Sequence, residues 1–149
     1  QPLLNAVVHE LSPVWRQKQL SVTVEAPDQL LSALTDPDRL KQILVNLVDN
    51  AVKYTPDGGK ILVKASQEAD EVKFTVKDSG IGIPAEDLPR IFERFYRIDK
   101  ARARSVGGTG LGLAIVKQLI DGLGGTIEVE SKPDAGTTFV FTLPAAEQD

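Results

Sequence analysis

The sequence predicts one α+β domain, a two-layer sandwich in which helices cover one face of a mixed, mostly antiparallel sheet. Three observations predict this class. The expected elements follow the order helix, strands, helix, hairpin, loop, helix, hairpin. Two pairs of strands lie close enough in the chain to form antiparallel hairpins. The two long helices each carry a single apolar stripe, as expected for helices that pack on one face only.

The chain begins with a predicted helix over residues 4–19, in which apolar residues recur at helical spacing. Pro13 should kink or restart this helix, because proline has no N–H to donate. Residues 20–25 then alternate apolar and polar side chains, which predicts a half-buried strand. We also expect a short strand over residues 30–34.

A central helix is predicted over residues 36–55, and it opens with an Asp-Pro-Asp sequence that suits a helix N-terminus. Its apolar stripe consists of Leu40, Ile43, Leu44, Leu47, Val48 and Ala51. At about 100° per residue, Asn46, Asn50 and Lys53 fall together on one flank of that stripe. These side chains would offer oxygen ligands and a positive charge to a bound molecule. The alternative is that both asparagines hydrogen-bond only solvent or a neighbouring loop.

The remaining strands form the two hairpins, the first of them closed by residues 67–70. Their strands cover residues 61–65, 72–76, 126–131 and 137–143. Between the hairpins we expect a short helical piece over residues 86–95, interrupted by Pro89, and a basic, mobile loop over residues 97–110. A helix then begins at Gly110 and is stopped by Gly124-Gly125. Its core stripe is Leu113, Val116, Ile120 and Leu123.

Composition limits the chemistry that the chain can carry. Its 149 residues suffice for one domain, residues 1–149, and 42% hydrophobic with 26% charged residues is typical of a soluble globular protein. The absence of cysteine excludes disulfides, thiolate metal sites and cysteine nucleophiles, and His9 is the only histidine. Because we find no apolar run of 18 residues and no basic start followed by an apolar stretch, we expect neither a transmembrane helix nor a signal peptide in these residues. The net charge of −4 argues against a nucleic-acid partner, whereas the basic segment from Arg90 to Arg104 suggests a small anion as ligand.

Two glycine-containing stretches are candidates for ligand binding. GGTGLGLA, residues 107–114, leads into a helix N-terminus, where exposed N–H groups and close backbone approach favour phosphate. It lacks the spacing of a P-loop and of a dinucleotide fingerprint, and it could also be a flexible connection. DSGIG, residues 78–82, places the carboxylate of Asp78 just past a strand end. It could form a tight turn with an Asx hydrogen bond, or accept a hydrogen bond from an exocyclic amine and so select adenine over guanine.

The order and spacing of NLVDNAVKYT, DSGIGIP, IFERFYR and GGTGLGLAI resemble the ATP-binding domain of bacterial sensor histidine kinases, over nearly the whole chain. That family adopts the Bergerat fold, which it shares with type II topoisomerases, heat-shock chaperone ATPases and mismatch-repair ATPases. The aromatic-rich IFERFYR segment favours the kinases over these relatives.

The resemblance implies a Mg²⁺ and phosphate site. Asn50 would be the metal ligand, coordinating Mg²⁺ through its side-chain oxygen, with Asn46 beside it. Lys53, Arg97 and Lys100 would contact the phosphates. Asn46, Asn50, Lys53 and Arg97 form the predicted catalytic set. Mg²⁺ is a hard cation that prefers oxygen ligands, and phosphoryl transfer depends on positioning and charge neutralisation, so these residue types suit the chemistry.

The resemblance also implies an adenine pocket. Asp78 would bind the adenine amino group, Tyr54 would pack on the ring, and Gly80, Gly82 and Ile83 would shape the pocket. Phe92 and Phe95 would anchor the start of a lid that closes over the phosphates. The remaining predicted cofactor-binding residues are Gly108, Thr109, Gly110, Leu111, Gly112 and Thr138. One departure lies in the segment DAGTTF, residues 134–139, where Asp134 replaces the first glycine of the family motif.

By this resemblance the chain would be a protein-histidine kinase catalytic domain. It would bind Mg-ATP and donate the γ-phosphate to a histidine on a separate phospho-acceptor and dimerisation domain, which we expect to lie outside the chain. A response regulator would receive the phosphoryl group indirectly. The domain itself would be cytoplasmic and monomeric, without nucleic-acid or direct membrane contact, in a full-length protein of a usually membrane-anchored family. His9 lies in HELSP, one residue short of the family's phospho-acceptor box, and we interpret it as an ordinary partly exposed residue.

Two other functions remain open. A Bergerat-fold ATPase module that drives conformational change would need a water-activating carboxylate on the asparagine-bearing helix, and Asp49 is the candidate. A pseudokinase would bind nucleotide without transferring phosphate, and the presence of Asn50, Lys53 and Asp78 argues against it.

Overall fold

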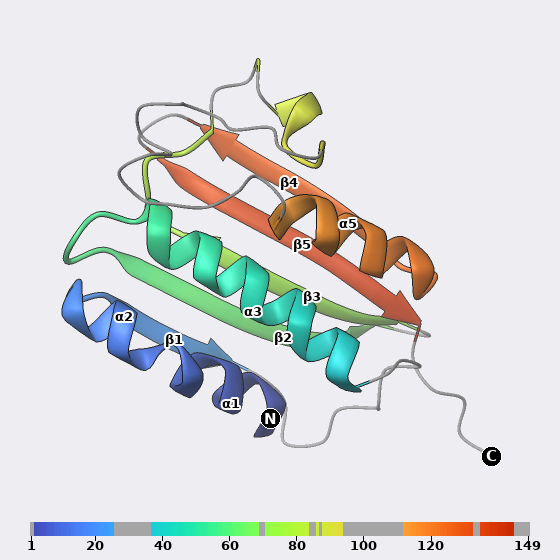
Figure 1. Cartoon of the computed structure of the whole chain (residues 1–149), viewed down its shortest axis with the longest axis horizontal. Coiled ribbons are helices and arrows are strands. Elements are labelled where there is room, and N and C mark those ends of the chain that lie inside the picture. Colours follow the sequence, from blue (N-terminus) through green and yellow to red (C-terminus); the bar gives the residue numbers. More distant parts are fainter. Residues whose placement is uncertain are drawn as a thin grey trace.

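The computed structural model describes residues 2–25, 37–68, 71–83, 86, 88–93, 112–132 and 135–144. Its strands are β1 (Ser21–Glu25), β2 (Lys60–Glu68), β3 (Glu71–Asp78), β4 (Thr126–Lys132) and β5 (Gly136–Pro144). Its helices are α1 (Pro2–Glu10), α2 (Ser12–Gln17), α3 (Pro37–Tyr54), α5 (Gly112–Gly122) and the 3-10 helix η1 (Leu88–Arg90). The strands form one sheet in the order β1-β2-β3-β5-β4, and α1, α3 and α5 lie across the same face of it (Figure 1). This arrangement confirms the predicted two-layer α+β class.

The sheet is mixed because β1 pairs with β2 in parallel, whereas the other three pairings are antiparallel. Both predicted hairpins are present. The first hairpin is longer than predicted, since Gln67 pairs with Val72 and Glu68 with Glu71. The prediction of a connection over residues 67–70 was therefore wrong at its first two residues, because the strand pairing continues through two polar side chains that the apolar alternation does not mark.

The core lies between the sheet and α3. Every residue of the predicted α3 stripe is at most 8% exposed, with Ile43, Leu44, Leu47 and Val48 at 0%. On β3 and β5 the side chains that face the helices are also buried, and Phe74 stacks on Phe141 with 4.8 Å between ring centroids. Burying each such side chain contributes about 1.5–3 kcal/mol, so this layer is the main source of stability.

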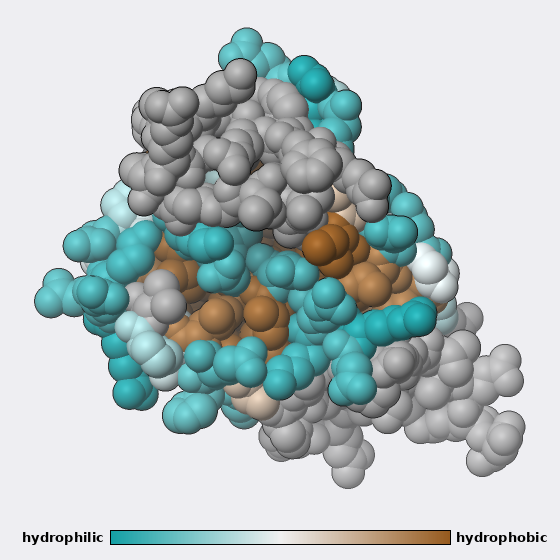
Figure 2. All heavy atoms as spheres, viewed as in Figure 1, coloured by the Kyte–Doolittle hydropathy of each residue, from teal (hydrophilic) through white to brown (hydrophobic). Residues whose placement is uncertain are grey.

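Alternation along the strands separates two chemically different faces. The side chains of Val76 and Asp78 lie on the face of β3 that the helices cover, whereas those of Lys73 and Lys77 lie on the opposite face. On the helix-bearing side, hydrophobic residues reach the surface in patches bordered by hydrophilic ones (Figure 2). Asp78 is therefore the one carboxylate on the buried face of β3, at the end of a row of apolar side chains.

Two further predictions can be compared with the structure. The N-terminal helix is interrupted at Leu11 and continues as α2, as Pro13 predicted. The predicted helical piece over residues 86–95 was too long, because the described residues there form only the single 3-10 turn of η1, centred on Pro89. The predicted strand over residues 30–34 and the basic loop over residues 97–110 lie outside the described residues. No helix in the described part of the chain is both long and apolar enough to span a membrane.

Candidate functional site

Asp78 is the last residue of β3 and only 6% exposed. Its Oδ1 accepts hydrogen bonds from the backbone N–H of Gly80 at 2.8 Å and of Thr137 at 3.2 Å. Burial raises the pKa of the Asp78 carboxyl, and the two backbone donors partly oppose that rise. None of the described residues hydrogen-bonds Oδ2. Among the described residues, the carboxylate is thus held through Oδ1 alone.

The loop after Asp78 is joined to the end of α3. The backbone N–H of Ile81 donates to the carbonyl oxygen of Tyr54 at 3.1 Å. A Cβ at Gly80 would lie 2.4 Å from that same oxygen, so this position needs glycine. Gly82 has φ of +76°, which also favours glycine. The predicted DSGIG motif and the asparagine-bearing helix therefore meet at Tyr54.

The flank of α3 carries the predicted phosphate and metal residues. Asn46, Asn50 and Lys53 are all half-buried, and no other described residue hydrogen-bonds either carboxamide. Lys53 Nζ lies 3.1 Å from Asp49 Oδ2, with these side chains 35% and 34% exposed. An ion pair this exposed contributes little to stability, so a stronger anion could replace Asp49 as the partner of Lys53. No group of three or more His, Cys, Asp or Glu side chains in the described residues could hold a metal ion. A metal ion bound at Asn50 would therefore take few ligands from this part of the chain.

The structure places Thr137, and not the predicted Thr138, beside Asp78. Thr137 is directly opposite Asp78 in the β3–β5 register and is 6% exposed. Thr138 pairs with Lys77 and Glu130, on the face of the sheet opposite α3. The prediction for Thr138 is therefore not supported, because alternate strand residues point to opposite faces. Counting back from the apolar Phe139 would have identified Thr137.

Ser131 was missed in the sequence, although it connects the Asp78 region to β4. Its Oγ accepts the backbone N–H of Ile83 at 2.6 Å and donates to the carbonyl oxygen of Gly136 at 3.0 Å. It also lies 2.8 Å from Thr137 Oγ1. A hydroxyl has one proton, and that of Ser131 goes to Gly136, so Thr137 must be the donor in the third bond. Ser131 thus fixes both Ile83, which is 4% exposed, and Thr137.

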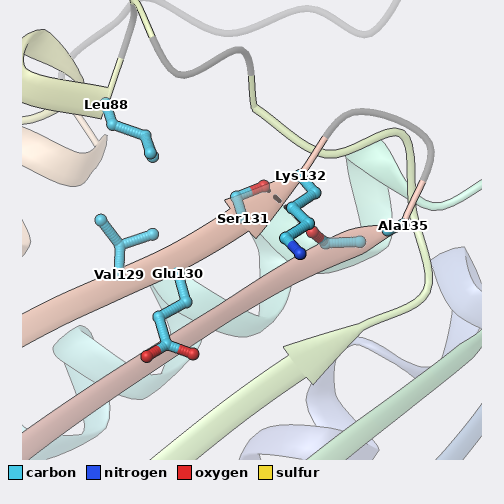
Figure 3. A pocket seen from close by; sticks show the side chains of 7 residues that line it. Leu88, Val129, Glu130, Ser131, Lys132 and Ala135 are labelled. Carbon is cyan, nitrogen blue, oxygen red and sulfur yellow. Dashed lines mark hydrogen bonds between the residues drawn. The ribbon is translucent and has the colours of Figure 1, made fainter.

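A shallow hollow of ≈ 470 Å³ adjoins this cluster at the outer edge of β4. Figure 3 shows Val129 and Ser131 on the same side of the strand as Leu88, whereas Glu130 and Lys132 point the opposite way. The hollow shares Ser131 and Gly136 with the Asp78 region, but Asp78 and the α3 flank do not line it. We therefore assign the candidate site to Asp78 and α3 and not to this hollow.

Replacing Ser131 with alanine should destabilise the domain by about 1–3 kcal/mol, because the N–H of Ile83 and the hydroxyl of Thr137 lose their acceptor. Urea unfolding measures this change. The matched control is Ser66→Ala, since Ser66 lies in β2 on the helix-free face and hydrogen-bonds none of the described residues through its hydroxyl. Equal unfolding midpoints for the two variants would show that Ser131 does not hold this region together.

Several predicted site residues lie outside the described residues: Arg97, Lys100, Gly108, Thr109, Gly110 and Leu111, together with Phe95. Gly112 is described, as the first residue of α5. Phe92 contacts the buried Phe139 edge-on, with 6.3 Å between ring centroids, so its ring packs on the core. The role of Phe92 as an anchor of a lid stays a prediction. His9 is exposed, as expected.

Comparisons with known proteins agree with this geometry. Residues 35–147 match the family model described as histidine kinase-, DNA gyrase B-, and HSP90-like ATPase. The sensor histidine kinase WalK of Bacillus subtilis is 46% identical over 124 residues, which are 82% of this chain but 20% of WalK. The chain therefore spans about a fifth of this curated relative.

Solved structures of histidine kinases have the same fold. Full-length ShkA in complex with AMPPNP superposes with a TM-score of 0.85 at 35% identity, covering 99% of this chain and 30% of that one. The catalytic domain of the histidine kinase ThkA has a TM-score of 0.83 at 32% identity, covering 97% of this chain and 91% of that domain. ThkA has also been solved in complex with the response regulator protein TrrA.

Proposed function

The chain belongs to the family of histidine kinase-, DNA gyrase B- and HSP90-like ATPases, within its histidine kinase catalytic domains, and we propose that it binds Mg-ATP and donates the γ-phosphate to a histidine of a separate phospho-acceptor domain. The proposal depends mainly on the carboxylate of Asp78, of which the described residues hydrogen-bond only Oδ1. The AMPPNP bound to ShkA, a related kinase, supports an adenine nucleotide as ligand.

Adenine selectivity follows from the two oxygens of Asp78. Oδ1 is occupied by backbone donors, so Oδ2 would accept the exocyclic amine of adenine. Guanine presents a carbonyl at the equivalent ring position, and two acceptors would then face each other without a proton between them. Tyr54, whose carbonyl oxygen accepts the N–H of Ile81, and the buried Ile83 would complete the pocket.

The phosphates would lie along the flank of α3. Lys53 would exchange its ion pair with Asp49 for the more highly charged phosphates, and Asn46 would support Asn50. The carboxamide oxygen of Asn50 suits Mg²⁺, which usually takes few ligands from protein and the rest from phosphates and water. Bound Mg²⁺ would neutralise negative charge on the phosphates. The residues of the chain bind and orient the nucleotide.

The predicted lid completes the proposal. Arg97, Lys100 and residues 108–112 would close over the phosphates, with Gly112 at the N-terminus of α5, where backbone N–H groups favour anions. The acceptor histidine and any general base would come from another domain. A response regulator would then receive the phosphoryl group, which the complex of ThkA with TrrA supports. We expect the reaction to take place in the cytoplasm, where ATP is available.

The second candidate function is an ATPase module that drives a conformational change. It would need Asp49 to activate water. In the structure the carboxylate of Asp49 is paired with Lys53 at 3.1 Å, but a transfer of Lys53 to the phosphates would release it, so turnover decides between the two functions.

Turnover distinguishes the two functions. We expect the chain alone to bind ATP but to release almost no phosphate from γ-labelled ATP. With a histidine-bearing acceptor domain of a relative added, the label should appear on that domain. Steady hydrolysis by the chain alone, abolished by Asp49→Asn, would instead support the ATPase module.

A further inference from the structure

The last turn of α3 is held by three separate segments of the chain. A helix leaves its last four carbonyl groups without partners inside the helix, which here are those of residues 51–54. Thr55 Oγ1 donates to the carbonyl oxygen of Ala51 at 2.6 Å. The backbone N–H of Ile81 donates to the carbonyl oxygen of Tyr54 at 3.1 Å. The side chain of Lys18 donates to the carbonyl oxygen of Val52 at 2.7 Å and to that of Lys53 at 3.3 Å. One lysine, far away in sequence, thus satisfies half of this helix end.

The backbone places Lys18 for this contact. It follows α2, and the next residue, Gln19, has φ of +57°, which turns the chain into β1. The carbonyl of Lys18 accepts the N–H of Gly58 at 3.0 Å, in the turn after α3. Lys18 is therefore held through its backbone carbonyl by the Gly58 turn and through its ammonium group by the α3 carbonyls. Its ammonium also lies at the negative end of the helix dipole.

This contact differs from two other lysine contacts of the helices. Lys41 pairs with Glu10, and Lys117 pairs with Asp121, but both pairs are between side chains that are 43% exposed or more. Such surface pairs contribute little. Lys18 is half-buried and donates to backbone carbonyls, which charged donors bind about twice as strongly as neutral donors do.

We propose that Lys18 is a positioning residue for the nucleotide site, linking the α1–α2 segment to the end of α3 that carries Lys53 and Tyr54. The inference rests on the proposed function, because these two residues are assigned there to phosphate and adenine. Without the ammonium, two carbonyls must turn toward water, and the last helical turn frays. Lys53 and Tyr54 then lose their fixed directions, and such small displacements at a site reduce binding strongly.

The test compares Lys18→Met, which keeps the length of the side chain but removes the charge, with Lys18→Arg, which keeps both charge and donors. The control is Ile120→Val. Ile120 is fully buried beside Gly125 and Thr142, at the end of the sheet opposite Asp78. Calorimetry gives the ADP dissociation constant at a temperature well below every unfolding midpoint, and thermal unfolding gives the midpoints.

We expect Lys18→Met to weaken ADP binding by about tenfold, Lys18→Arg to restore most of it, and Ile120→Val to lower the midpoint without changing ADP affinity. If the parent binds no nucleotide, the proposed function is wrong and this inference fails with it. If the parent binds ADP and Lys18→Met binds it equally well, only the inference is wrong. It is equally wrong if affinity falls in Ile120→Val as it does in Lys18→Met. Should Lys18→Met not fold, the same comparison is made with Lys18→Gln, which keeps one donor group.

Discussion

Asp78→Asn should weaken ADP binding by about 10–100-fold while the domain stays folded. The N–H groups of Gly80 and Thr137 both point at Oδ1, so the carboxamide oxygen of asparagine would take that place. Its NH₂ group would then lie where Oδ2 of the parent would accept the hydrogen bond from adenine. Two donors, this NH₂ and the adenine amine, would face each other. The loss is specific to adenine, because the carbonyl of guanine would find a donor there.

Calorimetry with ADP and GDP measures this effect, and Asp57→Asn is the matched control, since Asp57 is exposed in the turn after α3. The control should bind ADP like the parent. Asp78→Asn should lose ADP affinity, and its ratio of GDP to ADP affinity should rise. An ADP affinity equal to that of the parent would remove Asp78 from the adenine pocket.

Asn50→Ala should abolish the dependence of nucleotide binding on Mg²⁺. Asn50 is half-buried, and no other described residue hydrogen-bonds its carboxamide, so truncation should leave the fold intact. Losing the only predicted protein ligand of the metal should remove most of the coupling between Mg²⁺ and nucleotide, which for paired ligands is typically about 5–150-fold.

The measurement is the ADP dissociation constant with Mg²⁺ and with excess chelator. Gln42→Ala, on the exposed side of the same helix, is the control and should keep the parental coupling. If Asn50→Ala shows the same Mg²⁺ effect as the parent, Asn50 is not a metal ligand.

Local patterns in the sequence were sufficient for the elements that form the core. The Asp-Pro-Asp start and the apolar stripe predicted α3, and alternation of apolar and polar side chains predicted the strand β3. Alternation also explains why Thr137, and not the predicted Thr138, lies beside Asp78, since Thr137 is on the buried side of β5. The helical piece over residues 86–95 was predicted too long, because charged and apolar residues are mixed there without a clear period.

Long-range contacts could not be predicted in this way. Ser131 contacts Ile83 across 48 positions, and Lys18 contacts Val52 across 34. Neither residue has a distinctive local pattern, because its role depends on where other segments lie. The resemblance to histidine kinases pointed to Asp78, but only the structure shows that the described residues hold one of its oxygens and not the other. That asymmetry carries the adenine assignment.

The central claim is that the chain has an adenine nucleotide site that includes a metal ion. The most direct test is the thermal unfolding midpoint with ADP, ATP and GDP, each with and without Mg²⁺. A ligand that binds only the native state raises the midpoint by mass action. We predict a rise with both adenine nucleotides that Mg²⁺ alters, and no rise with GDP. Equal rises with ADP and GDP, or none with any nucleotide, would contradict the account.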